Sequence, residues 1–310
     1  MAETEDGAIE PETTHDADAA PGADEPGTPT ERSEQRSAED REWVPVIVKR
    51  NDQAVRHPDD ILTAAIGEGL EQLQRPRGSL ALSALAAGMI LAFTAMAVGV
   101  VTTLLAPYEL PELTRLGAAL VYPLGFIICL MAGTELFTEH TATAVYPVLD
   151  RKSGFLPMLG LWGLVGGFNL VGAFAGAGFL AVAEPVIGAR EGYLEIGRHL
   201  VEFDSLPLFA SALLAGWLMA LAGWLMLSMP PSFAQIVLIY VVTFTIGLGG
   251  LHHSIAGSVE LFVALLVGAG IGPGDALRFL ALALTGNLVG GSVFVALLNY
   301  GHIRQSQGKG

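Results

Sequence analysis

The 310-residue chain is apolar, with 52% hydrophobic and only 15% charged residues. A mean hydropathy of +0.52 is typical of a polytopic helical membrane protein and excludes an ordinary soluble domain. The net charge of −15 belongs mostly to residues 1–42, whose 14 acidic and 3 basic residues give −11. One cysteine, Cys129, excludes a disulfide framework. No basic patch with aromatic residues occurs, so nothing indicates nucleic-acid binding.

The chain begins with an acidic segment that has too few apolar residues to form a packed core. Residues 1–57 therefore predict a disordered acidic tail and linker. Residues 58–77 follow as an amphipathic helix, because their leucines and isoleucines recur at helical spacing after Asp59 or Asp60, either of which can serve as the N-cap. We expect this helix to lie on the membrane surface or against the helical bundle.

Uncharged runs of membrane-spanning length fill residues 78–304, because a bilayer core about 30 Å thick needs roughly 20 apolar residues per helix. They predict six spans, at 79–108, 116–149, 155–183, 205–229, 232–270 and 279–303. Six crossings place both termini on one side, with 305–310 as a short tail. Twelve of the sixteen Lys and Arg residues fall on that side, which predicts that both termini are cytoplasmic.

The second and fifth spans are interrupted, at Gly133–Thr143 and at Gly247–Gly257. Irregular backbone and ionisable side chains at membrane depth are tolerated only beside protein or water. The two halves enter the membrane from opposite sides, so the matched interruptions predict an inverted repeat of three helices with its site near the midplane. Asn169 and Asn287 occupy roughly matching spans, and we expect them to bond across helices.

The interruptions carry two specific motifs. The first reads Gly-Thr-Glu-Leu-Phe-Thr from Gly133, and the second reads Gly-Leu-His-His-Ser-Ile-Ala from Gly250. This pair resembles the signature of the formate/nitrite transporter family, over about residues 58–304. The resemblance implies an all-α polytopic plasma-membrane protein: a homo-pentamer of aquaporin-like protomers, each with a pore for small monovalent anions or their weak acids, and no cofactor.

The same resemblance implies positions along the pore. Thr138 and His253 match the pair that meets at the pore centre. Tyr122, Phe126 and Phe137 match apolar constrictions toward the cytoplasm, and Ile246 matches one on the outer side. The supporting polar residues are Glu135, Glu139, His140, His252 and Ser254, and Arg198 is the candidate for a basic residue in the outer funnel.

This sequence departs from the family pattern at three places. The family often has Gly-Asn where this chain has Glu139-His140, and an acidic or other polar residue where it has His252. Gly257 replaces the second motif's later asparagine. These departures concern the choice of substrate rather than the fold.

The chemical problem for such a pore is the charge of the anion. An unpaired carboxylate in an apolar medium costs tens of kcal/mol, and an imidazole is the side chain that titrates nearest physiological pH. We therefore expect His253 to hydrogen-bond the anion and donate or relay a proton, with Thr138 orienting the ring or substrate. His252 is expected to hydrogen-bond the broken backbone or the Glu135 side of the first motif. Helix N-termini at the two breaks would add positive potential.

An alternative belongs to another class of protein. Glu135, Glu139, His140, His252 and His253 could serve as the ligands of an intramembrane metal-dependent enzyme. No His-Glu-x-x-His spacing or catalytic nucleophile accompanies them. A water or glycerol channel would instead carry Asn-Pro-Ala motifs, which this sequence lacks.

Overall fold

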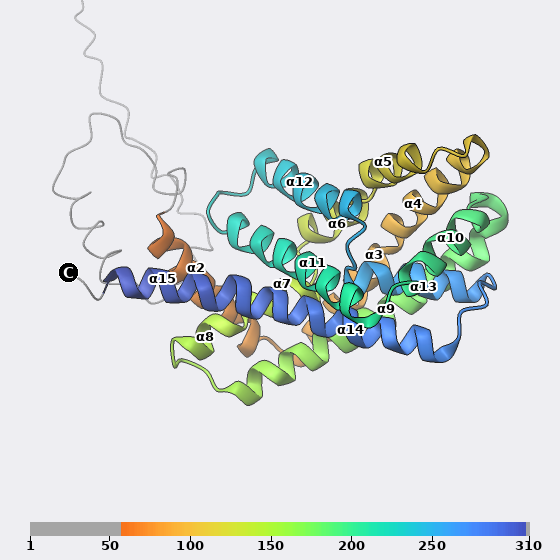
Figure 1. Cartoon of the computed structure of the whole chain (residues 1–310). Helices are drawn as coiled ribbons and strands as arrows, with labels where there is room; N and C mark the ends of the chain where they lie inside the picture. The colour runs from red at the N-terminus through yellow and green to blue at the C-terminus, as the bar shows by residue number, and fades with distance from the viewer. Residues whose placement is uncertain (1–56, 308–310) are drawn as a thin grey trace, which may run out of the picture.

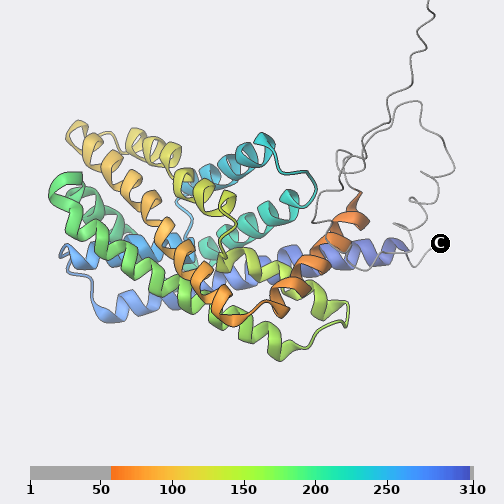
Figure 2. The ribbon, with the colours of Figure 1, turned by 180° about the vertical axis from the view of Figure 1, so that it is seen from behind.

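The computed structural model describes residues 57–307, and this part of the chain is helical, with no strand. Figures 1 and 2 show an elongated bundle in which α2 and the end of α15 lie at one end, here called the terminal end, and α10 lies at the other, the distal end. The helices are α2 (Pro58–Gln74), α3 (Arg77–Ile90), α4 (Ala92–Leu105), α5 (Pro111–Val121), α6 (Pro123–Met131), α7 (Phe137–Thr143), α8 (Val145–Leu149), α9 (Phe155–Ile187), α10 (Arg190–Val201), α11 (Ser205–Met226), α12 (Phe233–Gly249), α13 (Ser254–Leu266), α14 (Pro273–Gly291) and α15 (Leu298–Gln307).

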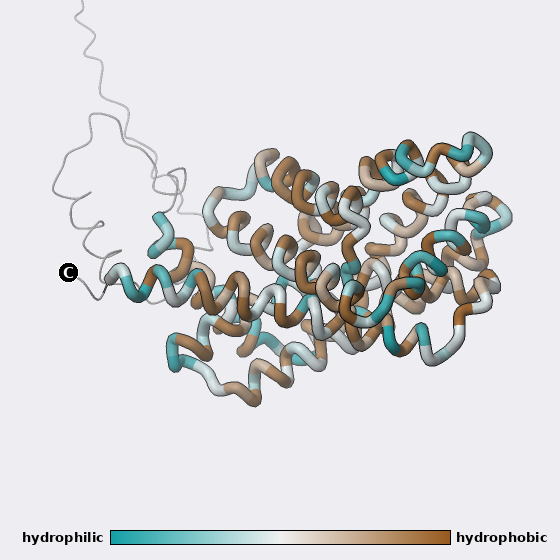
Figure 3. Tube along the Cα trace, in the orientation of Figure 1, coloured by the Kyte–Doolittle hydropathy of each residue, from teal (hydrophilic) through white to brown (hydrophobic). Residues whose placement is uncertain are grey.

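Five helical segments of the described chain are long and apolar enough to span a membrane, and the bent pair of α12 and α13 makes a sixth. The five are α3 with α4, α5 with α6, α9, α11, and α14 with α15, the last pair joined by a π-helical turn. Along the trace, hydrophilic residues gather at the terminal end and around α5 and α10 (Figure 3). The six spans expected from the hydrophobic runs are confirmed.

The second and fifth spans are discontinuous, as predicted. Helix α6 ends at Met131 and α7 begins at Phe137, while α12 and α13 are bent by 53° across residues 250–253. Each break contains a glycine in the left-handed region, Gly133 with φ 63° and Gly250 with φ 60°. Because this conformation strains residues that carry a Cβ atom, glycine suits both turns.

An asparagine on α9 holds the first break. Asn169 Oδ1 accepts the backbone N–H of Phe137 (2.7 Å), and its Nδ2 donates to the carbonyl oxygens of Ala84 (2.7 Å) and Glu135 (2.9 Å). The side chain is fully buried. It therefore satisfies broken-span groups that would otherwise lie unpaired in an apolar bundle.

Asn287 on α14 holds the second break in the same way. Its Oδ1 accepts the N–H of Ser254 (2.8 Å), and its Nδ2 donates to the carbonyl oxygens of Ala212 (2.7 Å) and His252 (3.0 Å). The two sets of hydrogen bonds show which residues of the first half are equivalent to which residues of the second half. Glu135 corresponds to His252, and the intervening Leu136 corresponds to His253.

Close packing repeats the correspondence between the halves. A Cβ atom on Gly172 would lie 2.2 Å from the carbonyl oxygen of Leu85, and one on Gly290 would lie 2.2 Å from that of Leu213. Both glycines let helix backbones approach closely, α9 against α3 and α14 against α11. The inverted three-helix repeat predicted from the sequence is thus visible in both hydrogen bonds and packing.

The N-terminal helix differs from expectation at its ends. It begins at Pro58, directly after His57, so neither Asp59 nor Asp60 is the N-cap. Instead, the Asp60 carboxylate accepts the His57 N–H (3.2 Å) from inside the first turn. The helix ends at Gln74, ahead of the predicted 77, since Pro76 cannot continue it. Its apolar face is buried against the bundle, with Leu62 fully enclosed.

The expected tails fall mostly beyond the described residues. Residues 1–56, which carry the acidic segment, and residues 308–310 lie outside them. Helix α15 continues to Gln307, so the predicted short tail at 305–310 begins inside a helix.

Candidate functional site

The two breaks bring Thr138 and His253 together. Thr138 lies in the first turn of α7 and His253 directly precedes α13. Thr138 Oγ1 lies 3.0 Å from His253 Nε2, and both side chains are buried. This is the contact predicted from the sequence, which distinguished His253 from its neighbour His252.

The hydrogen bonds of His253 fix which ring nitrogen carries the proton. Its Nδ1 accepts the backbone N–H of Ala256 (3.2 Å), which makes the imidazole the N-cap of α13. Because a backbone N–H can only donate, Nδ1 is an acceptor and the neutral ring carries its hydrogen on Nε2. His253 therefore donates to Thr138 Oγ1, which leaves the threonine hydroxyl hydrogen for another acceptor. The ring edge of Phe126 lies against the imidazole at a centroid distance of 4.9 Å.

Three backbone N–H groups beside the centre are already engaged. Those of Ser254, Ala256 and Gly257 donate to Asn287 Oδ1, His253 Nδ1 and the His253 carbonyl oxygen. The start of α13 contributes its positive potential, but these three groups are not free donors for an anion. The side-chain hydrogens of His253 and Thr138 also lie at this centre.

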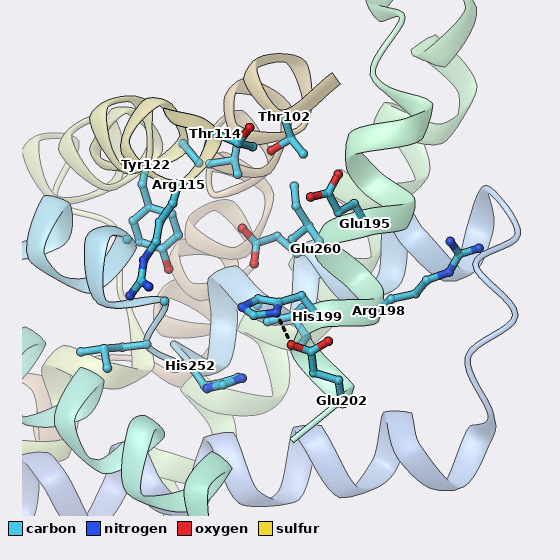
Figure 4. Close-up of a pocket in the computed structure, with 18 of the residues that line it drawn as sticks. Thr102, Thr114, Arg115, Tyr122, Glu195, Arg198, His199, Glu202, His252 and Glu260 are labelled. Atoms are coloured by element: carbon cyan, nitrogen blue, oxygen red, sulfur yellow. Dashed lines mark hydrogen bonds and ion pairs between the residues drawn. The ribbon is translucent and has the colours of Figure 1, made fainter. Parts of the chain in front are cut away.

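A cavity of about 850 Å³ reaches from the distal end to His253 (Figure 4). It lies among α4, α5, α10, α12 and α13, and its wall includes Tyr122, Ile246, His252 and Glu260. The prediction that Tyr122 lies toward the cytoplasmic termini, away from Ile246, is wrong, because both residues line this distal cavity. Tyr122 precedes α6 by one residue and stands one helical turn farther from the termini than Phe126.

A smaller cavity of about 250 Å³ opens at the terminal end. Glu135, Glu139 and His140 line it together with residues of α2. The Glu135 carboxylate accepts a hydrogen bond from Arg75 Nη1 and contacts His140 Nε2. The two cavities thus approach the Thr138–His253 pair from opposite ends of the bundle.

His252 lies on the distal side, away from Glu135. Its Nδ1 lies 2.8 Å from Ser211 Oγ, which also accepts the His252 backbone N–H (3.1 Å). The ring packs near Phe203 and Phe279, and its buried Nε2 has no hydrogen-bond partner among residues 57–307. The expectation that the His252 side chain bonds the broken backbone or the Glu135 side is therefore wrong. A serine forty-one positions earlier in the sequence holds it instead.

The remaining predicted residues have the following positions. Phe137 is buried beside Gly166 and is not among the residues lining either cavity. Ser254 anchors its backbone to Asn287, while its buried hydroxyl has no partner within the described chain. Arg198 lies in the cavity wall, but its guanidinium points away from the other labelled side chains (Figure 4), and its Nε donates to the Ala269 carbonyl oxygen (3.4 Å).

Other side chains complete the distal cavity. Arg115 reaches over it from α5 and donates through Nε to the Leu248 carbonyl oxygen (2.7 Å), and His199 pairs with Glu202 (2.6 Å). Glu260 has a signal in the sequence, because it follows His253 by seven positions and so lies two turns along the same helix face. The departure at Gly257 has a packing reason: a Cβ atom there would lie 2.7 Å from the Phe279 ring.

The five residues of the metal-enzyme alternative do not form one set. Glu135, Glu139 and His140 line the terminal cavity, whereas His252 and His253 line the distal one. Over residues 57–307, no group of three or more His, Cys, Asp or Glu side chains is placed to hold a metal ion.

Comparison with known proteins places the chain among transporters. The model of the family described as "Formate/nitrite transporter" matches residues 59–301. The chain belongs to this family. It is 32% identical over 244 residues to the "Inner membrane protein YfdC" of Escherichia coli K12, covering 76% of each chain. It is 27% identical to a "Probable formate transporter" of Methanothermobacter thermautotrophicus, covering 72% of this chain and 88% of that one.

Solved structures agree on the fold. An "FNT family ion channel" superposes with a TM-score of 0.70 at 18% identity, covering 78% of this chain and 98% of the other. A "Pentameric formate channel with formate bound" gives 0.64 at 22% identity, covering 74% and 98%. This member of the formate/nitrite transporter family is therefore a multi-pass membrane transport protein and not an enzyme.

Proposed function

We propose that each protomer of a homo-pentamer conducts a small monovalent anion of the formate/nitrite class as its conjugate weak acid, past Thr138 and His253. One observation carries this proposal. The 3.0 Å contact between these side chains lies where the two broken spans meet, with a cavity on either side. The similarity to a pentameric formate channel with formate bound supports both the assembly and the substrate class.

The geometry makes the centre a site for a neutral molecule. Phe126 packs against His253, and Ile246 and Leu136 are fully buried in the same region of the bundle. A bare carboxylate in such surroundings costs tens of kcal/mol, whereas the protonated acid avoids most of that cost. The acid's carbonyl oxygen accepts from His253 Nε2 or Thr138 Oγ1, so the two side chains replace part of its hydration.

The distal cavity opens to the outside and both termini lie in the cytoplasm. The excess of Lys and Arg on the terminal side supports this orientation. We place the protein in the plasma membrane, as the name of the Escherichia coli relative suggests.

The test is uptake of weak acids into proteoliposomes over a range of pH. Wild-type protein should carry formate or nitrite, and His253→Phe should abolish this uptake at every pH because phenylalanine offers no hydrogen bond. Thr138→Val should reduce it strongly. His302→Phe, on the exposed face of α15, is the matched control and should retain full uptake.

Uptake that survives His253→Phe at every pH would refute the central site. Native mass spectrometry of the purified protein tests the pentamer, and a monomer would contradict that part of the proposal.

A further inference from the structure

Glu260 is a buried carboxylate that the central site does not explain. It lies on α13 within the broken fifth span, is only 6% exposed, and lines the distal cavity. Figure 4 shows its side chain directed into that cavity. No hydrogen bond or ion pair to its carboxylate occurs within residues 57–307. An unpaired acid at membrane depth is costly and usually has a function.

The charged groups that α10 turns toward the cavity leave Glu260 without a cation. Glu191 and Glu195 are acidic, and His199 is paired with Glu202. Arg198 turns its guanidinium away, toward the Ala269 carbonyl oxygen. The wall formed by α10 is thus acidic rather than basic.

The groups on the other walls are likewise engaged elsewhere. Arg115 on α5 bonds to the Leu248 carbonyl oxygen, and Tyr122 offers a phenol without positive charge. His252 is held by Ser211. His253 uses Nδ1 for the N-cap and Nε2 for Thr138. None of these residues neutralises Glu260.

The bonding of His253 bears on where a proton can come from. Its neutral ring has one hydrogen, on Nε2, and giving that hydrogen away would leave an imidazolate. The ring can therefore hydrogen-bond a passing molecule, but it holds no proton to transfer, which corrects the expectation from the sequence that His253 donates or relays one. An anion that is to pass the centre as a neutral acid must gain its proton before it arrives.

We propose that Glu260 is the proton donor and selectivity residue of the distal cavity. Its carboxyl O–H bond breaks as an O–H bond forms on an oxygen of the entering anion. The neutral acid moves on to His253, and the remaining Glu260 carboxylate regains a proton from hydronium in the cavity water. This inference rests on the proposed function and adds to it the residue that chooses the substrate.

Selectivity among the anions follows from how strongly each anion binds a proton. Anions of weak acids, such as formate, acetate and nitrite, take the proton. Nitrate and chloride, the anions of strong acids, do not take the proton and so remain charged. Glu139, in the terminal cavity beside Thr138, is also without a hydrogen bond or ion pair in the described chain, and it is placed to accept the proton on release.

The experiment compares weak-acid and strong-acid anions in proteoliposomes containing full-length protein. Glu260→Gln preserves size and hydrogen bonding but removes the acid. It should lower formate uptake at neutral pH by about tenfold or more, the scale of a lost general acid, and reduce the preference for formate over nitrate. Glu260→Asp should keep that preference. Glu112→Gln, at an exposed position on α5 outside the cavity lining, is the matched control and should change neither quantity.

A second measurement uses unaltered protein, in case Glu260→Gln does not assemble. A hydrophobic carbodiimide reacts with protonated carboxyl groups in apolar sites. We expect peptide mapping to find modification at Glu260, with loss of formate uptake in proportion.

Two results would overturn the inference: Glu260→Gln with wild-type uptake and preference at every pH, or modification of Glu260 without loss of uptake. Failure of the proposed function looks different, because wild-type protein would then carry no weak acid at all, or would carry it undiminished after His253→Phe.

Discussion

The two breaks have the same pattern of backbone hydrogen bonds but carry different side chains. Asn169 and Asn287 make the same three hydrogen bonds to equivalent atoms. Yet the position held by Glu135 in one break is held by His252 in the other. The terminal-side carboxylate contacts Arg75 and His140, whereas Nε2 of the distal imidazole has no hydrogen-bond partner within the described chain. The asparagine hydrogen bonds thus hold both breaks alike, while the breaks present different polar side chains to the two cavities.

Replacing either asparagine should cause the largest loss of stability, because each side chain holds the backbone of a broken span. In Asn169→Leu and Asn287→Leu, three buried backbone groups each lose a partner, and each unpaired group costs about 1–3 kcal/mol. We expect both variants to lose about 3 kcal/mol or more, measured by thermal unfolding in detergent. Thr285→Val, at an exposed position on α14, should change stability little. A large loss in only one of the two variants would contradict the equivalence of the breaks.

The next prediction concerns the unequal side chains. Glu135→Leu leaves Arg75 and His140 without their carboxylate, and breaking a buried ion pair costs about 3–5 kcal/mol. His252→Leu loses a hydrogen bond to Ser211 and should cost only about 1 kcal/mol. Chemical unfolding of the two variants under one set of conditions tests this difference. Equal losses would show that the distal break is anchored as strongly as the other.

The smallest loss of stability is expected for substitutions in the loops at the two ends of the helical bundle. Burial alone would raise the pKa of Asp150, but hydrogen bonds from Lys152 (2.6 Å) and Arg304 lower it below its usual value. A lowered pKa means that the ionised form stabilises the fold above about pH 4 and that this contribution is lost in stronger acid. Asp150→Asn should thus cost about 1 kcal/mol at neutral pH, and this cost should shrink as the pH falls below about 4.

Arg278 provides the contrast at the distal end. It donates to the carbonyl oxygens of Phe203 (2.6 Å) and Val201 (2.7 Å), groups that do not titrate, and its only titrating partner in the described chain is the exposed Asp275, 3.7 Å away. Most of the loss in Arg278→Gln should therefore persist in acid. Unfolding measured as a function of pH separates the two variants, and a pH-independent loss in Asp150→Asn would refute the ion-pair explanation.

The local sequence pattern predicted the spans and their breaks, but it did not predict which distant residues contact one another. Apolar runs and matched interruptions located the spans and breaks, and the two motifs located Thr138 and His253. The side of the bundle on which Tyr122 lies depends on where α5 passes into α6, and the direction of Arg198 depends on a carbonyl oxygen seventy-one positions away. The residues next to Tyr122 and Arg198 in the sequence therefore do not indicate where these two side chains lie. Arg75 and Glu135 are similarly joined across sixty positions, so packing alone brings them together.

The hydrogen bond that caps α13 couples the protonation of His253 to the conformation of the helix. The His253 ring, which we propose as the substrate contact, also caps the helix through the bond from the Ala256 N–H to Nδ1. A second proton on the imidazole would occupy Nδ1 and displace that bond, and losing an N-cap costs a helix about 1 kcal/mol. Charging His253 and loosening the first turn of α13 are thus one event. Strong acid would act on the distal half of the broken span as a change in shape, in addition to its effect on the substrate.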